Sequence, residues 1–169
     1  MNNKDYQKKI TLSNGKNVLI RPITVADKEM EWNFVHNLSQ EAKNFRFFGT
    51  QKDLSPQMLN FFTDIDYQKH MALIAVHEGQ EIAVARFFCE DDMKSCEFAI
   101  VVDEKWQHLG LGGELIKSLI EIAKNNQIQE MKGDVLPQNS KMIEFVKELG
   151  FEVSSHPQDR HLLLARKNL

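Results

Sequence analysis

The sequence predicts an α/β fold, in which a mixed, largely antiparallel central sheet carries helices on both faces. Three observations predict it: an Asn-Gly turn between two N-terminal strands, a run of three further strands, and a C-terminal alternation of amphipathic helices with strands. The chain has 169 residues, of which 42% are hydrophobic and 27% charged. A chain of this length buries a sizeable core, so we expect residues 1–169 to form one domain.

The first two strands are expected at residues 8–13 and 17–22, on either side of Ser13-Asn14-Gly15-Lys16. Asn-Gly tolerates positive φ at both central positions of a tight turn, which makes it a strong hairpin signal. Pro22 lacks a backbone N–H and ends the second strand.

Helical signals follow this hairpin. Thr24 is expected to cap a helix that reaches about Leu38, with Asp27 completing a weak capping box. A short helix is expected from Gln40, and Ser55-Pro56 starts a third helix through an N-cap and a proline in the first turn.

Three strands are then expected in succession, at about 71–77, 81–88 and 96–102, as an antiparallel meander. Cys89 and Cys96 would face each other across the second turn if residues 92 and 93 turn tightly. A reduced pair in a sheet is the favoured interpretation, because two cysteines make neither a disulfide framework nor a metal site.

After Gly112 the hydrophobic period becomes helical, which predicts a helix over 112–125. A strand at about 129–136 and a helix at 140–149 follow, the latter ended by Gly150. Strands near 151–154 and 161–166 complete the sheet.

Composition excludes several classes of protein. The net charge of −3 does not provide the basic footprint of a nucleic-acid-binding protein. No apolar run approaches the ~20 residues of a membrane helix, so no membrane association is expected. The polar N-terminus lacks the apolar centre of a signal peptide, which favours a cytoplasmic location.

The loop from Gln107 to Gly113 is the most informative segment, because an apolar strand runs into it and an amphipathic helix leaves it. Its glycines allow positive φ and close approach of a ligand, and backbone amides at a helix N-terminus attract phosphate. The alternative is a tight strand-to-helix turn without a ligand. A Walker loop is excluded because Glu114 follows Gly113, and a dinucleotide fingerprint because the preceding strands are antiparallel.

The pattern Gln107-x-x-Gly110-x-Gly112 resembles the acyl-CoA pyrophosphate motif of the Gcn5-related N-acetyltransferase (GNAT) superfamily. The order of strand, loop, helix, strand, Asn139 and helix also resembles that superfamily, over almost the whole chain. The resemblance implies an N-acetyltransferase with acetyl-CoA as acyl donor and no metal. It also implies a sheet that splays near residues 100–102, between the strands that the superfamily counts as fourth and fifth.

A narrower resemblance is to the acetyltransferase domain of bacterial protein lysine acetyltransferases that modify acyl-CoA synthetases. It rests on residues 18–23, 44–48, 65–67 with 71–73, and 97–102. It implies a protein substrate with an exposed lysine, with an acyl-CoA synthetase as the expected type of partner. The additional regulatory domain that those enzymes often carry is not expected, because this chain has no room for it.

The resemblance implies that Glu97 is the general base. A lysine amine has a pKa near 10.4 and must lose a proton before it attacks a thioester, and a positioned base is worth about 10²–10⁴-fold. The alternative is an ordinary strand glutamate that faces solvent.

The resemblance also implies which residues bind the donor and the acceptor. Main-chain groups of Ile100, Val101 and Val102 would pair with the pantetheine arm, and Asn139 would contact the same arm, although it also suits a helix cap. The loop residues Gln107, His108, Leu109, Gly110, Leu111, Gly112 and Gly113 would bind the pyrophosphate. Candidate acceptor residues are Arg46, Asp66 and Tyr67, and a structural turn is equally expected at residues 64–67.

One position departs from the superfamily pattern. Many members have a tyrosine on the helix after the asparagine, which protonates the departing thiolate, whereas Val146 stands there and no tyrosine follows Tyr67. Two other functions stay open: acetylation of a small amine such as a polyamine, amino acid or antibiotic, and acyl-CoA sensing without catalysis. A deep acidic pocket would favour a small amine, and an open, shallow one a protein.

Overall fold

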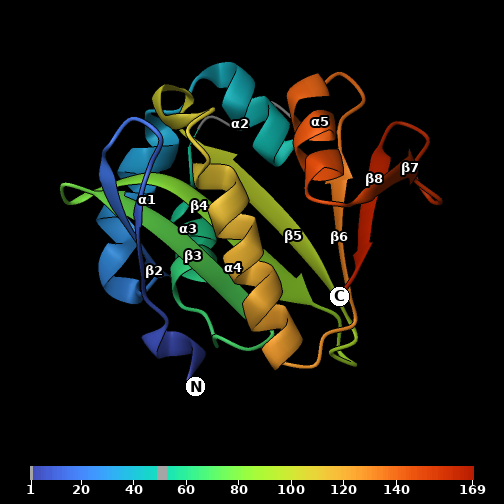
Figure 1. The fold of residues 1–169 in the computed structure, drawn as a ribbon, viewed down its shortest axis with the longest axis horizontal. Coiled ribbons are helices and arrows are strands. Elements are labelled where there is room, and N and C mark those ends of the chain that lie inside the picture. The colour runs from blue at the N-terminus through green and yellow to red at the C-terminus, as the bar shows by residue number, and fades with distance from the viewer. Residues whose placement is uncertain (1, 49–52) are drawn as a thin grey trace.

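The computed structural model describes residues 2–48 and 53–169, in which eight strands form one sheet of order β1-β2-β3-β4-β5-β6-β8-β7 (Figure 1). The strands are β1 (Lys8–Thr11), β2 (Asn17–Pro22), β3 (His70–His77), β4 (Gln80–Cys89), β5 (Ser95–Val102), β6 (Glu130–Val135), β7 (Glu152–Ser155) and β8 (Leu163–Asn168). The α-helices are α1 (Lys28–His36), α2 (Gln40–Phe47), α3 (Pro56–Thr63), α4 (Leu111–Asn125) and α5 (Ser140–Glu148). Short 3₁₀ turns cover Asn3–Asp5, Val25–Asp27 and Glu104–Trp106.

The sheet is antiparallel at every pair of neighbouring strands except β5 and β6, which run parallel. The strand crossover that makes this pair parallel is α4, as Figure 1 shows. The mixed, largely antiparallel class that the sequence predicts is therefore confirmed.

Helices cover both faces of the sheet, as predicted. On one face Leu115 and Leu119 of α4 pack against Leu73 of β3, together with residues of α5. On the other face Phe34 of α1 packs against Ile74, together with residues of α2 and α3. Figure 1 shows α4 crossing the first face, with α1 and α3 behind the sheet. None of the helices in the described ranges combines the length and apolar character that crossing a bilayer requires.

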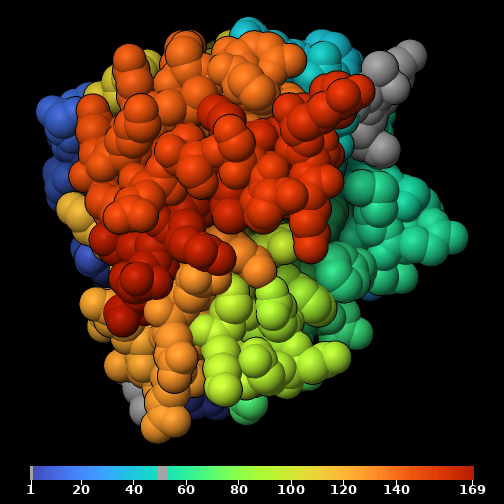
Figure 2. Space-filling model, turned by 90° about the vertical axis from the view of Figure 1, so that its right-hand side faces the viewer, coloured from blue at the N-terminus to red at the C-terminus, as the bar shows by residue number. Residues whose placement is uncertain are grey.

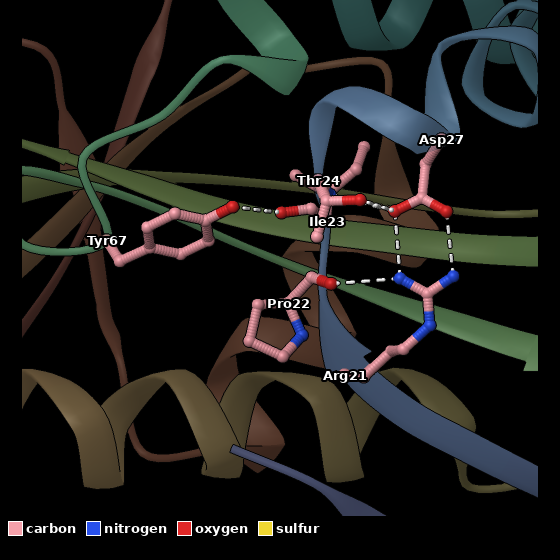
Figure 3. Close-up of polar contacts among 6 residues, drawn as sticks. All are labelled: Arg21, Pro22, Ile23, Thr24, Asp27 and Tyr67. Atoms are coloured by element: carbon pink, nitrogen blue, oxygen red, sulfur yellow. Dashed lines mark hydrogen bonds and ion pairs between the residues drawn. The ribbon is translucent and has the colours of Figure 1, made fainter. Parts of the chain in front are cut away.

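The first helix begins later than the sequence predicts, because a 3₁₀ turn precedes it. Arg21 forms two hydrogen bonds to the Asp27 carboxylate, of 2.7 and 2.8 Å, and the same carboxylate accepts the backbone N–H of Thr24 at 2.8 Å. Figure 3 shows this arrangement at the end of β2. The carboxylate therefore completes the predicted capping box while it is held by the strand before it.

The last strand is shifted by two residues from the predicted 161–166. The ring of His156 accepts the backbone N–H groups of Gln158 and Asp159 through Nδ1, at 3.1 and 3.0 Å. These bonds hold a turn after β7, so that β8 begins only at Leu163.

The parallel pairing of β5 and β6 is short. It comprises Ser95 with Glu130, Cys96 with Met131, and Glu97 with Lys132, although β5 continues to Val102 and β6 to Val135. The strands therefore separate from Phe98 onward, a stretch that includes the residues 100–102 at which the sequence predicts the splay.

Cys89 and Cys96 face each other in the register of β4 and β5, as the sequence predicts for a tight turn. Both are buried and both are free thiols. Their side chains belong to the core beneath α4 and α5, so they are structural neighbours of the splay.

Candidate active site

A cleft of about 260 Å³ lies where β5 and β6 separate. Glu97 of β5, Val135 of β6 and Met142 of α5 line one part of it, and Phe45 of α2 and Phe61 of α3 line another. Figure 2 shows this face, where α5 and the C-terminal strands (orange to red), the β4–β5 hairpin (yellow-green) and α3 (teal) meet. The cleft thus joins the splayed strands to the helices of the opposite layer.

Glu97 is exposed at this cleft. Strand alternation places its side chain on the face that α1, α2 and α3 cover, whereas the neighbouring Phe98 packs into the core beneath α4 and α5. Among the described residues no hydrogen bond or ion pair holds the Glu97 carboxylate. Lys132, its partner in the strand register, bonds instead to Glu90, and that bond raises the pKa of Lys132, with a further contribution from Glu97. The carboxylate is therefore free to accept a proton from a ligand.

The backbone edge of β5 beyond Glu97 faces the opening. Glu90 N–H donates to the Ser95 carbonyl at 2.9 Å, so alternate residues of β5, Val101 included, direct their backbone groups toward β4. Ile100 and Val102 direct their backbone groups to the opposite edge of β5, which β6 no longer pairs with at this point. Of the three residues that the resemblance implies for pantetheine, Ile100 directs both backbone groups toward this edge, and Val102 directs its N–H there while its carbonyl accepts the Gln107 side chain. Val101 has its side chain in the core and its backbone toward β4.

The loop after β5 is tied to the strand by Gln107, whose side-chain amide donates to the Val102 carbonyl at 3.0 Å. His108 and Gly110 both have positive φ, of 60° and 89°, which turns the chain toward α4. Gly110 is the N-cap of α4, and the first bond into the helix runs from Glu114 N–H to the Gly110 carbonyl at 3.2 Å.

Three backbone amides at the start of α4 have no backbone partner in the described part of the chain: Leu111, Gly112 and Gly113. They lie at the positive end of the helix dipole, so this end suits a phosphate group. The two glycines have different surroundings. A β-carbon at Gly112 would lie 3.2 Å from Cε2 of Phe145 on α5, whereas Gly113 has open space. Gly112 therefore lets α5 approach the loop.

Asn139 is the N-cap of α5 and lines the cleft. Its Oδ1 accepts the Met142 N–H at 3.2 Å, and no other hydrogen bond of the side chain occurs within the described residues, so Nδ2 is left to donate. The cap and a contact with a ligand are therefore compatible. Val146, on the same helix, is fully buried in the core and does not reach the cleft.

Arg46 of α2 also lines the cleft. Its guanidinium lies over two rings, 5.1 Å from the centroid of Phe47 and 5.7 Å from that of Phe62. Burial, followed by the positive charge of Arg86, lowers the pKa of Arg46 to about 10, with Glu31 acting in the opposite direction.

A buried polar cluster lies at the inner end of the cleft. Arg86 of β4, 6% exposed, forms an ion pair of 3.1 Å with Glu31 of α1, and its Nη1 donates to the Phe62 carbonyl at 3.1 Å. The same Nη1 lies 3.2 Å from Nε2 of His70. Burial and the charge of Arg86 lower the pKa of His70 to about 4, so its ring is neutral at pH 7.

Asp66 and Tyr67 lie apart from the cleft, in a separate groove beside the N-terminal segment. Asp66 accepts the backbone N–H groups of Gln68 and His70, each at 2.9 Å, and so holds a turn. The Tyr67 hydroxyl donates to the Ile23 carbonyl at 3.0 Å, as Figure 3 shows. Both side chains are bonded within the fold and neither lines the cleft that contains Glu97, whereas Arg46, the third candidate acceptor residue, does.

Sequence reasoning missed Arg86, Glu31 and His70. One signal was available, because Arg86 follows four apolar residues and precedes two more in the predicted strand 81–88, whose first residue is Glu81. A buried arginine requires a carboxylate, but the distance along the chain hides Glu31 as its partner.

Known proteins with a similar sequence or fold support this geometry. A model of the acetyltransferase (GNAT) family matches residues 32–151. The acetyltransferase PA5475 of Pseudomonas aeruginosa is 34% identical over 160 residues, which cover 92% of this chain and 86% of that protein. The GNAT domain of S. lividans PAT superposes with a TM-score of 0.91 at 26% identity, covering 96% of this chain and 97% of that domain.

A likeness to the cAMP-binding acyltransferase from Mycobacterium smegmatis concerns the fold alone. Its TM-score is 0.67 at 20% identity, and the match covers 96% of this chain but 47% of that one. The family match, by contrast, spans well over half of the present sequence and includes the loop, Glu97 and Asn139. The chain therefore belongs to the GNAT family of acetyltransferase enzymes.

Proposed function

We propose that this enzyme transfers the acetyl group of acetyl-CoA to a lysine side chain of a protein, with Glu97 as the general base. One observation carries the proposal: an exposed carboxylate, with no hydrogen bond or ion pair to any described residue, stands on β5 immediately before that strand leaves β6. It is therefore next to the backbone edge on which the acetyl donor is expected to lie.

The residues at the splay fit acetyl-CoA. The amides of Leu111, Gly112 and Gly113 would bind the pyrophosphate, and Gln107 would hold the loop through its bond to β5. The free backbone groups of Ile100 would pair with the pantetheine arm, and Asn139 Nδ2 would donate to it. When bound, acetyl-CoA supplies an activated acetyl thioester.

Glu97 performs the first proton transfer. A lysine amine, with an ordinary pKa near 10.4, arrives protonated and gives a proton to the Glu97 carboxylate, directly or through a water molecule. The neutral amine nitrogen then attacks the carbonyl carbon of the thioester and forms the new C–N bond as the C–S bond breaks, and the nitrogen gives up its second proton to solvent to become the amide. Val146 has no proton to give to the thiolate and is fully buried, so a solvent proton completes the reaction.

The walls of the cleft favour a protein acceptor over a polyamine. Arg46 and Arg86 line it together with Glu97 and Asp134, so the lining has no excess of negative charge that would attract a polycation. Three exposed aromatic side chains also belong to its lining: Phe48, Phe61 and Phe88, which are 46%, 53% and 48% exposed. Exposed aromatic groups are typical of surfaces that bind other proteins.

The likeness to the GNAT domain of S. lividans PAT further supports a protein lysine as acceptor. The sequence resemblance to lysine acetyltransferases makes an acyl-CoA synthetase the first partner to test. We place the reaction in the cytoplasm, a reducing compartment that suits the two free thiols of Cys89 and Cys96.

The proposal is tested by measuring CoA release from acetyl-CoA with two panels of acceptors, purified acyl-CoA synthetases and small amines. The variant is Glu97→Gln, and the matched control is Glu152→Gln, which changes another exposed strand glutamate at the far edge of the sheet. We expect turnover with protein acceptors, a loss of about 10²-fold or more in Glu97→Gln, and no loss in the control.

Other outcomes contradict specific parts of the proposal. Turnover with small amines alone would exclude a protein acceptor and leave the fold and the donor intact. Tight acetyl-CoA binding without transfer to either panel would instead indicate an acyl-CoA sensor. Unchanged turnover in Glu97→Gln would remove Glu97 from the mechanism.

A further inference from the structure

Arg46 is a cation in the wall of the cleft, and none of the carboxylates in the described part of the chain is bonded to it. Within the described ranges, 2–48 and 53–169, no ion pair or hydrogen bond of its guanidinium occurs, and its contacts are the rings of Phe47 and Phe62. A partly buried guanidinium normally forms ion pairs or hydrogen bonds, because its removal from water is costly.

The neighbouring charges do not neutralise Arg46. Glu31, 2% exposed, is bonded to Arg86, which competes with Arg46 for its charge. Glu97 and Asp134 also line the cleft, and within the described ranges neither is bonded to Arg46. The other acid of the buried cluster is Glu81, whose pKa is raised well above its usual range by burial first and by the negative charge of Glu31 second. Neither Glu81 nor the neutral ring of His70 is bonded to Arg46, so within the described ranges no carboxylate contact balances its positive charge.

The guanidinium of Arg46 lies on the side of the cleft where the acceptor is expected to bind, rather than the donor. The Arg46 guanidinium lies on α2, against Phe62 of α3, on the sheet face to which Glu97 also points. The groups expected to bind the donor, Ile100 and Asn139, line the same cleft on its α4 and α5 side and lead to the start of α4. A ligand group that reaches Arg46 therefore enters with the amine.

We propose that Arg46 binds a carboxylate of the acceptor, so that the preferred acceptor carries a carboxylate close to its reactive amine. This inference rests on the proposed transfer to an amine at Glu97 and names the chemistry that selects that amine. A guanidinium binds a carboxylate through two parallel hydrogen bonds, and the ring of Phe62 holds it in place for such a contact.

Two kinds of acceptor can supply this carboxylate. In a protein acceptor it is an aspartate or glutamate side chain beside the target lysine. In a small acceptor it is the α-carboxylate of an amino acid. A hydrogen bond to a charged group contributes enough to discriminate about 10-fold or more against an acceptor that lacks the charge.

The test compares matched acceptors that differ in one charge. The small pair is Nα-acetyl-lysine and Nα-acetyl-lysinamide. The peptide pair is an end-blocked lysine peptide with aspartate before the lysine and the same peptide with asparagine. The measured quantity is the ratio of kcat/KM for the charged and neutral member of each pair, in wild type, Arg46→Gln and Arg46→Lys. The control is Arg166→Gln, which removes a surface arginine paired with Glu130.

We expect the wild-type ratio to be about 10 or more in at least one pair, to fall to about 1 in Arg46→Gln, and to be partly kept in Arg46→Lys. The pair that shows the effect identifies the source of the carboxylate. Both kcat/KM values of a ratio are measured on the same variant, so a lower fraction of folded protein changes both equally and leaves the ratio unchanged. A ratio near 1 in wild type, or one that Arg46→Gln leaves unchanged, would overturn the inference.

A failure of the proposed function is distinguishable from a failure of this inference. If none of the acceptors is turned over, direct titration of the same four probes into the CoA-loaded protein decides the matter. Preferential binding of the charged probes that is lost in Arg46→Gln supports the carboxylate site although catalysis fails. Equal binding of charged and neutral probes to wild type refutes it.

Discussion

The ring of Phe98 fills the space that a side chain at position 133 would need: a β-carbon on Gly133 would lie 2.6 Å from Phe98 Cε1. These residues are the first on β5 and β6 beyond the last paired residues, Glu97 and Lys132. The Phe98 ring also packs against Phe151, with centroids 5.0 Å apart. An aromatic side chain at the opening thus fills the gap between the strands on the α4 and α5 face, and leaves Glu97 on the opposite one.

Gly133→Ala is therefore expected to destabilise the enzyme by about 1–3 kcal/mol, because the added methyl group overpacks the core against Phe98. The displaced ring should also disturb the β5 edge, so acetyl-CoA should bind more weakly. Urea unfolding measures the first effect and titration of acetyl-CoA the second.

A double variant separates this contact from a general loss of stability. Phe98→Leu shortens the side chain that the alanine meets, so Phe98→Leu with Gly133→Ala should be more stable than the sum of the two single changes indicates. Simple additivity would show that the two residues do not oppose each other in the folded protein.

Gly110→Ala tests the loop at the start of α4. Gly110 has a φ of 89°, and a β-carbon added there would meet open space, so the expected cost is backbone strain of about 1–2 kcal/mol rather than a clash. Gly113→Ala is the matched change without positive φ, and should preserve or raise stability, because alanine favours a helix. Thermal unfolding of both variants measures the difference, and equal effects would contradict the strain at Gly110.

Arg86→Met is expected to destabilise the fold by about 3–5 kcal/mol, because it leaves the carboxylate of Glu31 buried without its cation. The control is Arg166→Met, which removes a half-exposed partner of Glu130 and should cost less than about 1 kcal/mol. Chemical unfolding measures both. A small effect in Arg86→Met would show that the ion pair with Glu31 contributes little to the stability of the fold.

The sequence was sufficient to predict the sheet, its helices on both faces and the order of elements around the loop. These features depend on local signals, such as the Asn14-Gly15 turn and the change to helical period after Gly112. Contacts between residues that are distant in the sequence have no such local signal and could not be predicted. The bond between Arg86 and Glu31 joins residues 55 positions apart, and nothing in the local pattern connects them.

The candidate site shows the same division. Glu97, Asn139 and the loop follow one another along the C-terminal half and carry a recognisable pattern, so their placement around the splay could be predicted. Tyr67 is a candidate acceptor residue in the sequence, with a structural turn as the equal alternative, and in the structure its hydroxyl donates to the Ile23 carbonyl. The side on which a half-buried tyrosine finds its partner depends on tertiary packing that a single sequence does not reveal.

His70 predicts a pH dependence of stability. Its pKa in the folded enzyme is about 4, against an ordinary value of 6.5, because burial and the Arg86 guanidinium disfavour a positive ring. Between these two values the unfolded chain binds a proton that the folded chain does not, so the free energy of unfolding falls as the pH falls through that window. The full loss from this group is about 3 kcal/mol, and it ends below pH 4, where both states are protonated.

The measurement is urea unfolding at pH values between 4 and 7, in wild type and in His70→Gln. Glutamine has an amide oxygen that can accept the Arg86 N–H in place of Nε2, but it does not titrate. The free energy of unfolding of wild type minus that of His70→Gln should fall as the pH falls. Asp27 and Glu81 are present in both proteins, so their contributions cancel in this difference. A difference that is constant over this range would mean that His70 keeps its ordinary pKa, and that the guanidinium of Arg86 does not face its unprotonated nitrogen in solution.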